Sequence, residues 1–143
     1  MINSLENINL DFKKSFHAVF KNPQLVQSFI TKRSNTFDEI IKQEFCRREL
    51  ETDFALVALG GYGRKELFPS SDIDLSIIQF DAKTKKIEDL KDFIGWLWTL
   101  KVKVGHSVRT IKDIENITKS DLKEFTSYLS HRIIFCKKIK LPV

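Results

Sequence analysis

The chain of 143 residues contains little cysteine and no long apolar run. Its two cysteines, Cys46 and Cys136, lie far apart, so the spacing suits neither a disulfide framework nor a cysteine metal site, and free thiols in a reducing cytosol are expected. No stretch approaches the roughly 20 apolar residues of a membrane span. Residues 1–6 lack the basic and apolar regions of a signal peptide. We therefore expect a cytoplasmic protein with no membrane partner.

Internal repeats and low-complexity linkers are also missing, and the length favours one domain. A composition of 42% hydrophobic and 30% charged residues is ordinary for a globular protein. We expect residues 1–50 to form an N-terminal helical segment and residues 51–143 to form the core of a single compact domain. The net charge of +5 comes from lysines spread along the chain, which favours a solvated surface over a nucleic-acid interface.

Apolar residues at helical spacing predict several helices. The first covers residues 9–21, and a long amphipathic helix follows from Pro23 to Leu50, with Asn22 as its cap. A further helix begins at Ile87 and carries its apolar stripe to Leu100. Towards the C-terminus, residues 111–118 and 121–136 are predicted to form two more helices.

The most informative stretch begins with an apolar run, Phe54 to Leu59, that is typical of a strand buried on both faces. Gly60, Gly61 and Gly63 follow it, and such glycines let backbone N–H groups approach a ligand closely. Residues 62–68 are expected to start a short helix whose N-terminal end favours an anion. The guanidinium of Arg64 suits phosphate.

Two aspartates stand at the start of the next apolar run, Ile73 to Phe80. Side chains alternate between the faces of a strand, so Asp72 and Asp74 should project from the same face. Mg²⁺ is commonly held by one or two carboxylates together with substrate phosphates and water. Taken alone, a glycine pair indicates only a turn, and Asp-x-Asp is most often a solvated edge or a cap. Together they favour a nucleotide and metal site.

The string Gly60–Leu75, joined by Lys103–Thr110, resembles the N-terminal catalytic domain of bacterial PII uridylyltransferase/uridylyl-removing enzymes, in the DNA polymerase β nucleotidyltransferase superfamily. The resemblance implies an α+β nucleotidyltransferase fold with a small mixed sheet of about three to four strands, flanked by helices. It also implies Mg²⁺-dependent transfer of UMP from UTP to a tyrosine hydroxyl of the nitrogen-signalling protein PII.

Residue by residue, the resemblance makes Asp72 and Asp74 the catalytic ligands of a two-ion Mg²⁺ site. It makes Gly60 and Gly61 contacts of the nucleotide phosphates, with Arg64 and Ser71 as further nucleotide-binding candidates. The superfamily usually supplies a third carboxylate from the strand that corresponds to residues 101–110. Here the polar face of that strand carries none, so either the nucleotide and waters complete the coordination, or an acid from elsewhere does, or the site is weakened.

The strand pattern over residues 101–110 also predicts where His106 and Arg109 lie. His106 falls on the apolar face of a period-two pattern, which favours a core histidine over a catalytic base. Arg109 falls on the polar face and would reach phosphates if Asp72 and Asp74 share that face.

Relatives of this type are much longer, and we expect a truncated or reduced form without glutamine response or deuridylylating activity. Two alternatives stay open. One is a nucleotidyltransferase that acts on another protein or on a small-molecule hydroxyl. The other is a non-catalytic nucleotide-binding or docking module, which the missing third carboxylate favours.

Overall fold

The computed structural model describes residues 10–16 and 19–137, and predictions for residues 1–9, 17–18 and 138–143 lie outside that part of the chain. Residues 10–16 are helical. The elements that follow are α2 (Pro23–Arg47), the short 3₁₀ helix η1 (Leu50–Thr52), β1 (Phe54–Leu59), α3 (Gly60–Gly63), β2 (Ile73–Gln79), α4 (Ile87–Leu97), β3 (Val104–Thr110), α5 (Ile111–Ser120), α6 (Leu122–Tyr128) and β4 (Arg132–Phe135). No helix among the described residues is long and apolar enough to cross a bilayer.

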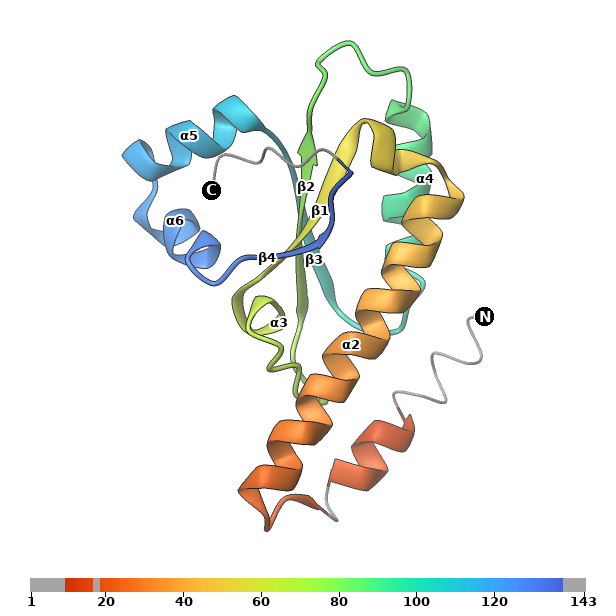
Figure 1. Ribbon diagram of the computed structural model, residues 1–143, viewed down its shortest axis with the longest axis vertical. Helices are drawn as coiled ribbons and strands as arrows, with labels where there is room; N and C mark the ends of the chain where they lie inside the picture. Colours follow the sequence, from red (N-terminus) through yellow and green to blue (C-terminus); the bar gives the residue numbers. More distant parts are fainter. Residues whose placement is uncertain (1–9, 17–18, 138–143) are drawn as a thin grey trace.

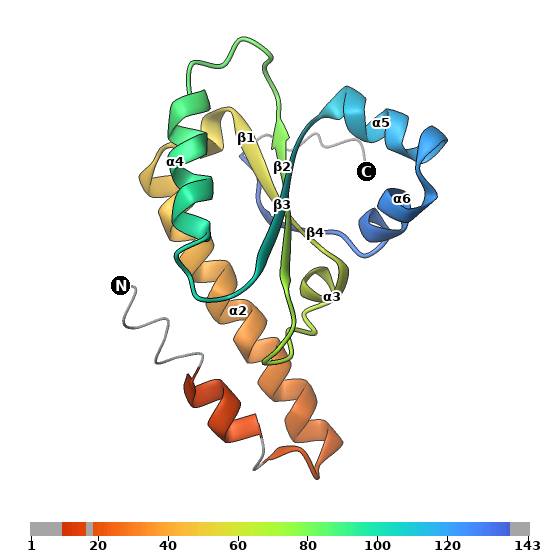
Figure 2. The same ribbon diagram turned by 180° about the vertical axis from the view of Figure 1, so that it is seen from behind.

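One mixed sheet of four strands, in the order β3-β2-β1-β4, organises the fold. β1 pairs antiparallel with both β2 and β4, whereas β2 and β3 run parallel and are connected through α4. In Figure 1, α2 and α4 cover one face of the sheet, while α3, α5 and α6 lie on the other. The same division is visible from behind in Figure 2. The predicted α+β fold with a small mixed sheet is confirmed.

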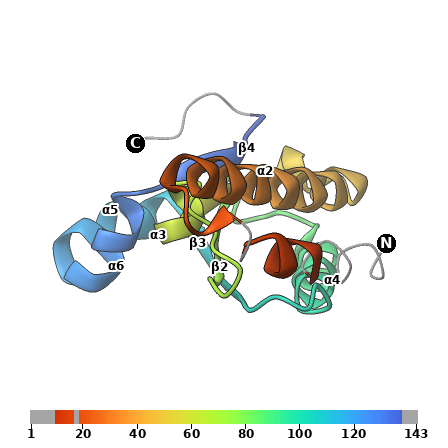
Figure 3. The ribbon, with the colours of Figure 1, turned by 90° about the horizontal axis from the view of Figure 1, so that it is seen from below.

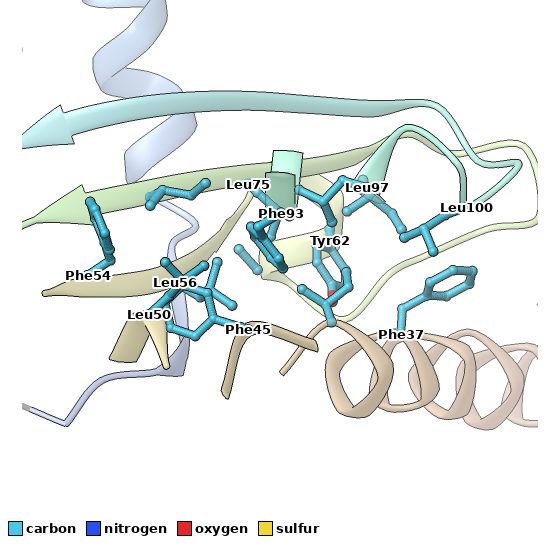
Figure 4. Packing of buried hydrophobic residues seen from close by; sticks show 14 of the residues in the cluster. Phe37, Phe45, Leu50, Phe54, Leu56, Tyr62, Leu75, Phe93, Leu97 and Leu100 are labelled. Atoms are coloured by element: carbon cyan, nitrogen blue, oxygen red, sulfur yellow. The ribbon is translucent and has the colours of Figure 1, made fainter. Parts of the chain in front are cut away.

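The main core lies between the sheet and the α2/α4 layer, where Phe37, Phe45, Phe54 and Phe93 are fully buried (Figure 4). A smaller cluster on the opposite face contains Ala55, Val57, Leu59 and Ile78. All six residues of β1 are buried, as the uninterrupted apolar run predicts. The rest of that second face, near the start of β2, carries polar groups.

α2 begins as the sequence predicts, because the Asn22 side chain accepts a hydrogen bond from Gln24 N and Pro23 stands in the first turn. The helix ends at Arg47, so the prediction that it continues to Leu50 is wrong. Glu49 has a φ of 54°, a left-handed conformation that ends the helical hydrogen-bond pattern. Leu50 then starts η1 and is fully buried.

The pH dependence of stability should report on Glu44, whose side chain is only 4% exposed. Two hydrogen bonds from Arg47, followed by one from Arg48, lower the pKa of this carboxyl below its ordinary 4.5 despite its burial. A depressed folded-state pKa stabilises the fold above pH 4.5, and that contribution is lost as the pH falls through the folded-state value. We therefore expect the thermal midpoint of Glu44→Gln to be lower at neutral pH and to converge on that of the parent in acid.

Thermal denaturation followed by circular dichroism, from neutral pH to well below the ordinary carboxyl pKa, checks this expectation. Glu88→Gln is the matched control, because Glu88 is 82% exposed in its pair with Lys91 and its loss should leave the profile unchanged. Parallel profiles for the Glu44 variant and the parent at all pH values would contradict the prediction.

The C-terminal region departs from the sequence prediction. The helix expected over residues 121–136 ends at Tyr128, and Arg132–Phe135 forms β4 at the edge of the sheet. The apolar stripe of the predicted helix is therefore not a core face, since Leu122 and Leu129 are 80% and 67% exposed. Pairing with β1, a tertiary interaction that local spacing does not encode, selects the strand.

The prediction for His106 is also wrong. His106 does lie on the α4 side of the sheet, but β3 is an edge strand and its outer part is uncovered, so the imidazole is exposed. Its ring lies 5.8 Å from that of Trp98. The apolar stripe predicted from Ile87 to Leu100 includes Trp98, but this side chain is 65% exposed, so the prediction is wrong at this position.

Candidate nucleotide and metal site

The glycine turn joins β1 to the site. α3 begins at Gly60, so the prediction that a helix starts at Tyr62 and runs to Phe68 is wrong, and only Gly60–Gly63 is helical. Gly60 has a φ of +58°, a conformation that an L side chain rarely adopts. The chain can therefore leave the buried strand and turn directly in front of β2.

Beneath this turn, three side chains from distant parts of the sequence form a polar cluster. The Tyr62 hydroxyl donates to Asp38 Oδ1 at 2.5 Å, and Arg132 donates to both oxygens of Asp38 at 2.6 and 3.1 Å. Arg132 also donates to the carbonyl oxygens of Tyr62 and Gly63. Burial, reinforced by Asp38, raises the pKa of Tyr62 well above its ordinary value. α3 is thus fixed to both α2 and β4.

The carboxylate of Asp74 lies between two residues that have no side chain. A Cβ placed on Gly60 would be 3.5 Å from Asp74 Oδ2, and one placed on Gly105 would be 2.8 Å from Oδ1. Gly105 is the register partner of Asp74 across the parallel β2–β3 pair. The space around the carboxylate therefore depends on both glycines, one directly after β1 and the other in β3.

The electrostatics of the pair favour a cation. Partial burial, followed by the nearby charge of Asp72, raises the pKa of Asp74, while Lys103 acts in the opposite direction. Lys103 Nζ lies 3.4 Å from Asp72 Oδ2, and both side chains are substantially exposed. Two neighbouring carboxylates with one exposed ammonium nearby suit a divalent ion held together with phosphates. The two carboxylates and the space left by the two glycines fit Mg²⁺, which Asp72 and Asp74 would hold.

Gly105→Ala should disable the site without unfolding the protein. At 2.8 Å the new methyl group would displace the Asp74 carboxylate, which is the movable partner of that contact. A misplacement of about 1 Å can reduce a rate on the order of 10²-fold, and we expect a loss of that size in nucleotide transfer. Alanine in place of glycine in a strand should leave the thermal midpoint equal or higher.

Gly95→Ala in α4 is the matched control, because a Cβ there meets nothing within 4 Å. It should raise stability by about 0.5–1 kcal/mol and leave transfer unchanged. Calorimetric titration of Mg²⁺·UTP into each variant measures the effect on the site. Parent-like binding and transfer by the Gly105 variant would show that Asp74 can move aside freely.

The remaining predicted site residues fall in two places. Arg64 lies at the glycine turn, since a Cβ on Gly61 would be 3.7 Å from its Nη2, and it donates to Glu66 and to Ser130. Ser71 lies in the loop before β2, where it lines a cavity formed together with the loop before β3. The structure thus brings Gly60, Gly61, Arg64 and Asp74 together and places Ser71 with Asp72 in the wall of that cavity.

Arg109 shares the face of Asp74, as its position in the strand pattern requires, but it is paired elsewhere. Its register partner on β2 is Ile78, two residues beyond Ser76. The Arg109 guanidinium donates a hydrogen bond to Glu124 of α6 at 2.6 Å. Ser76 in turn shares a 2.6 Å hydrogen bond with Tyr128. α6 therefore closes the far end of this face. Within residues 10–16 and 19–137, no three His, Cys, Asp or Glu side chains are grouped as metal ligands would be.

Arg33 of α2 holds the loop that leads to Asp72 and β2, and its role is not predicted from the sequence. Its side chain is 1% exposed and donates to the carbonyl oxygens of Leu67, Phe68 and Pro69 at 3.4, 2.9 and 3.4 Å. Burial lowers its pKa to about 10, so it stays a cation at neutral pH. The signal available was a charged residue on the apolar stripe of α2, between Ile30 and Phe37.

Comparison with known proteins bears on this arrangement directly. The family described as "Nucleotidyltransferase domain" matches residues 38–140, which include every element from the middle of α2 to β4. The chain belongs to the nucleotidyltransferase domain family. The matched range contains Asp38 and Arg132 as well as the glycine turn and the aspartate pair, so both the site and the cluster beneath α3 belong to the nucleotidyltransferase domain.

Several curated relatives share the name "Bifunctional uridylyltransferase/uridylyl-removing enzyme". The protein of Cupriavidus metallidurans is 36% identical over 127 residues, covering 88% of this chain and 15% of the relative. The protein of Pseudoalteromonas translucida is 36% identical over 132 residues, covering 90% of this chain and 15% of the relative. The protein of Photobacterium profundum is 35% identical over 136 residues, covering 92% of this chain and 15% of the relative. This nucleotidyltransferase domain thus corresponds to about 15% of the length of these relatives.

Proposed function

We propose that this nucleotidyltransferase domain transfers UMP from UTP to a tyrosine hydroxyl of a PII-type signalling protein in a Mg²⁺-dependent reaction. The observation that carries the proposal is the placement of Asp74 between Gly60 and Gly105, with Asp72 beside it. The uridylyltransferase name of the relatives supports the choice of nucleotide. The choice of acceptor rests on the resemblance of Gly60–Leu75 and Lys103–Thr110 to PII uridylyltransferases.

In this proposal each part of the site has a separate task. Asp72 and Asp74 hold the cation, which when bound supplies charge neutralisation for the phosphates and lowers the pKa of the acceptor hydroxyl. The backbone N–H groups of Gly60 and Gly61 contact the terminal phosphates, and Arg64 adds positive charge at the same turn. Arg33 and Arg132 position these groups by holding the loop before β2 and α3.

One observation favours a second candidate, a nucleotide-binding domain without catalysis. β3 places Gly105 and Ser107 beside Asp74 and Ser76, and no described acid joins Asp72 and Asp74 in a cluster of three potential ligands. Such a site would bind Mg²⁺·nucleotide and form no product.

The experiment combines binding with product formation. Calorimetric titration of UTP, ATP, CTP and GTP, with and without Mg²⁺, should give Mg²⁺-dependent binding that favours UTP. Incubation with labelled UTP and purified PII should then give labelled PII and pyrophosphate. Binding without product, also when small-molecule hydroxyls are offered, would favour the non-catalytic candidate. Transfer to a different acceptor would overturn the PII assignment, and binding of no nucleotide would overturn both candidates.

A further inference from the structure

The cavity that Ser71 lines has a volume of about 390 Å³ and lies where β2 and β3 begin. Its walls come from helix 10–16, α2, the loop before β2 and the loop before β3. Figure 3 shows the loop before β2 between α3 on one side and helix 10–16 on the other. The charged residues among those that line the cavity are Lys13, Arg33, Asp72, Lys101 and Lys103. Asp72 therefore belongs to this cavity and to the candidate metal site at once.

The charge of the cavity is strongly positive. Four cationic side chains face one carboxylate, and that carboxylate is the proposed ligand of a cation. Arg33 is engaged with the loop carbonyls and forms a fixed wall, while the three lysines stand at exposed positions on two different segments. Ser70 and Ser71 add hydroxyl groups, and Leu10 and Val102 add apolar surface. These walls suit a ligand that carries several anionic groups on a partly apolar frame.

The sheet order separates this cavity from the phosphate contacts. α3 follows β1 on one side of β2, whereas Lys101–Lys103 precede β3 on the other side. Nucleotidyl transfer places the leaving pyrophosphate and the attacking hydroxyl on opposite sides of the α-phosphorus. If Gly60 and Gly61 hold the leaving phosphates, the attacking group approaches from the side of β3 and this cavity.

We propose that the cavity binds the acidic residues that flank the accepting hydroxyl of a protein acceptor. This inference rests on the proposed function. The hydroxyl oxygen forms a bond to the α-phosphorus, the bond from that phosphorus to pyrophosphate breaks, and the hydroxyl proton passes to water. Lys13 and Lys101 contribute by binding the flanking carboxylates, so that the hydroxyl is held next to Asp72.

The test titrates two synthetic peptides, Glu-Asp-Tyr-Asp-Glu and Gln-Asn-Tyr-Asn-Gln, into the full chain. Binding is measured by NMR from the changes in the chemical shifts of the chain's backbone amides. The acidic peptide should bind saturably, shift the amides of Ser70 and Lys101, and bind at least tenfold more tightly than the neutral one. Lys13→Glu and Lys101→Glu should each weaken its binding at least tenfold. Lys85→Glu, an exposed position in the loop after β2, should leave it unchanged, and thermal denaturation confirms that each variant is folded.

A parallel titration with Mg²⁺·UTP separates this inference from the proposed function. Shifts at Gly60 and Gly61 from the nucleotide, with shifts at Ser70 and Lys101 only from the peptide, support both. Peptide binding at the cavity without any nucleotide binding supports the cavity assignment and overturns the proposed function. Equal binding of the two peptides, or nucleotide shifts centred on Lys13 and Lys101, overturns the inference.

Discussion

Asp74→Asn should reduce nucleotidyl transfer by about 10³-fold or more, which corresponds to about 4 kcal/mol of transition-state stabilisation. The amide removes the negative charge from the group that lies between Gly60 and Gly105, and no third described acid is grouped with Asp72 to replace it. Mg²⁺-dependent binding of UTP should weaken together with the rate, because the same carboxylate would hold the cation in the UTP complex and in the transition state.

The same substitution should not harm the fold. Partial burial and Asp72 raise the pKa of Asp74, so the ionised carboxylate is less favourable in the folded than in the unfolded chain at neutral pH. The neutral amide removes that penalty, and we expect an equal or higher thermal midpoint. A loss of activity accompanied by higher stability is typical of residues kept for function.

Asp92→Asn, at an exposed position in α4, is the matched control and should change neither the rate of transfer nor the thermal midpoint. Transfer is measured with labelled UTP and PII, and stability by thermal denaturation. Unchanged transfer in the Asp74 variant would rule out the metal-binding role of this residue. A large fall in the thermal midpoint would mean that the carboxylate has a structural role instead.

Local patterns in the sequence are enough to predict the elements that carry the site. An uninterrupted apolar run predicts β1, alternation predicts β2, and the stripe that starts at Ile87 predicts α4. The closeness of Asp72 to Asp74, whose pKa it helps to raise, follows from their separation of two positions in the sequence. These features are local, because each depends on residues within a few positions of one another.

What the sequence does not reveal depends on strand order and register. His106 is exposed because β3 lies at an edge, and the four residues of β4 are a strand only because β1 pairs with them. The approach of Gly105 to Asp74 likewise requires the parallel register of β2 and β3. No spacing within the chain states which strands are neighbours, so these features emerge only from tertiary structure.

Arg132→Met should destabilise the fold by about 3 kcal/mol, a large share of the roughly 5–15 kcal/mol that stabilises a typical domain. Arg132 is 21% exposed and Asp38 is 14% exposed, so little water is available to replace the guanidinium. The variant would leave Asp38 without its bidentate partner, and the carbonyl oxygens of Tyr62 and Gly63 would lose a donor. Chemical denaturation measures the difference in the free energy of unfolding.

Lys91→Met is the control for this variant, because its pair with Glu88 is exposed and should contribute less than about 1 kcal/mol. Arg132→Lys keeps the charge but cannot make both hydrogen bonds to Asp38, and we expect it to lie between the parent and the methionine variant. Since Arg132 also fixes α3, nucleotide binding should weaken in the same order even at temperatures where all variants are folded. If instead the lysine variant matches the parent in stability while its nucleotide binding falls, the cluster of Asp38, Tyr62 and Arg132 orients the glycine turn without stabilising the fold.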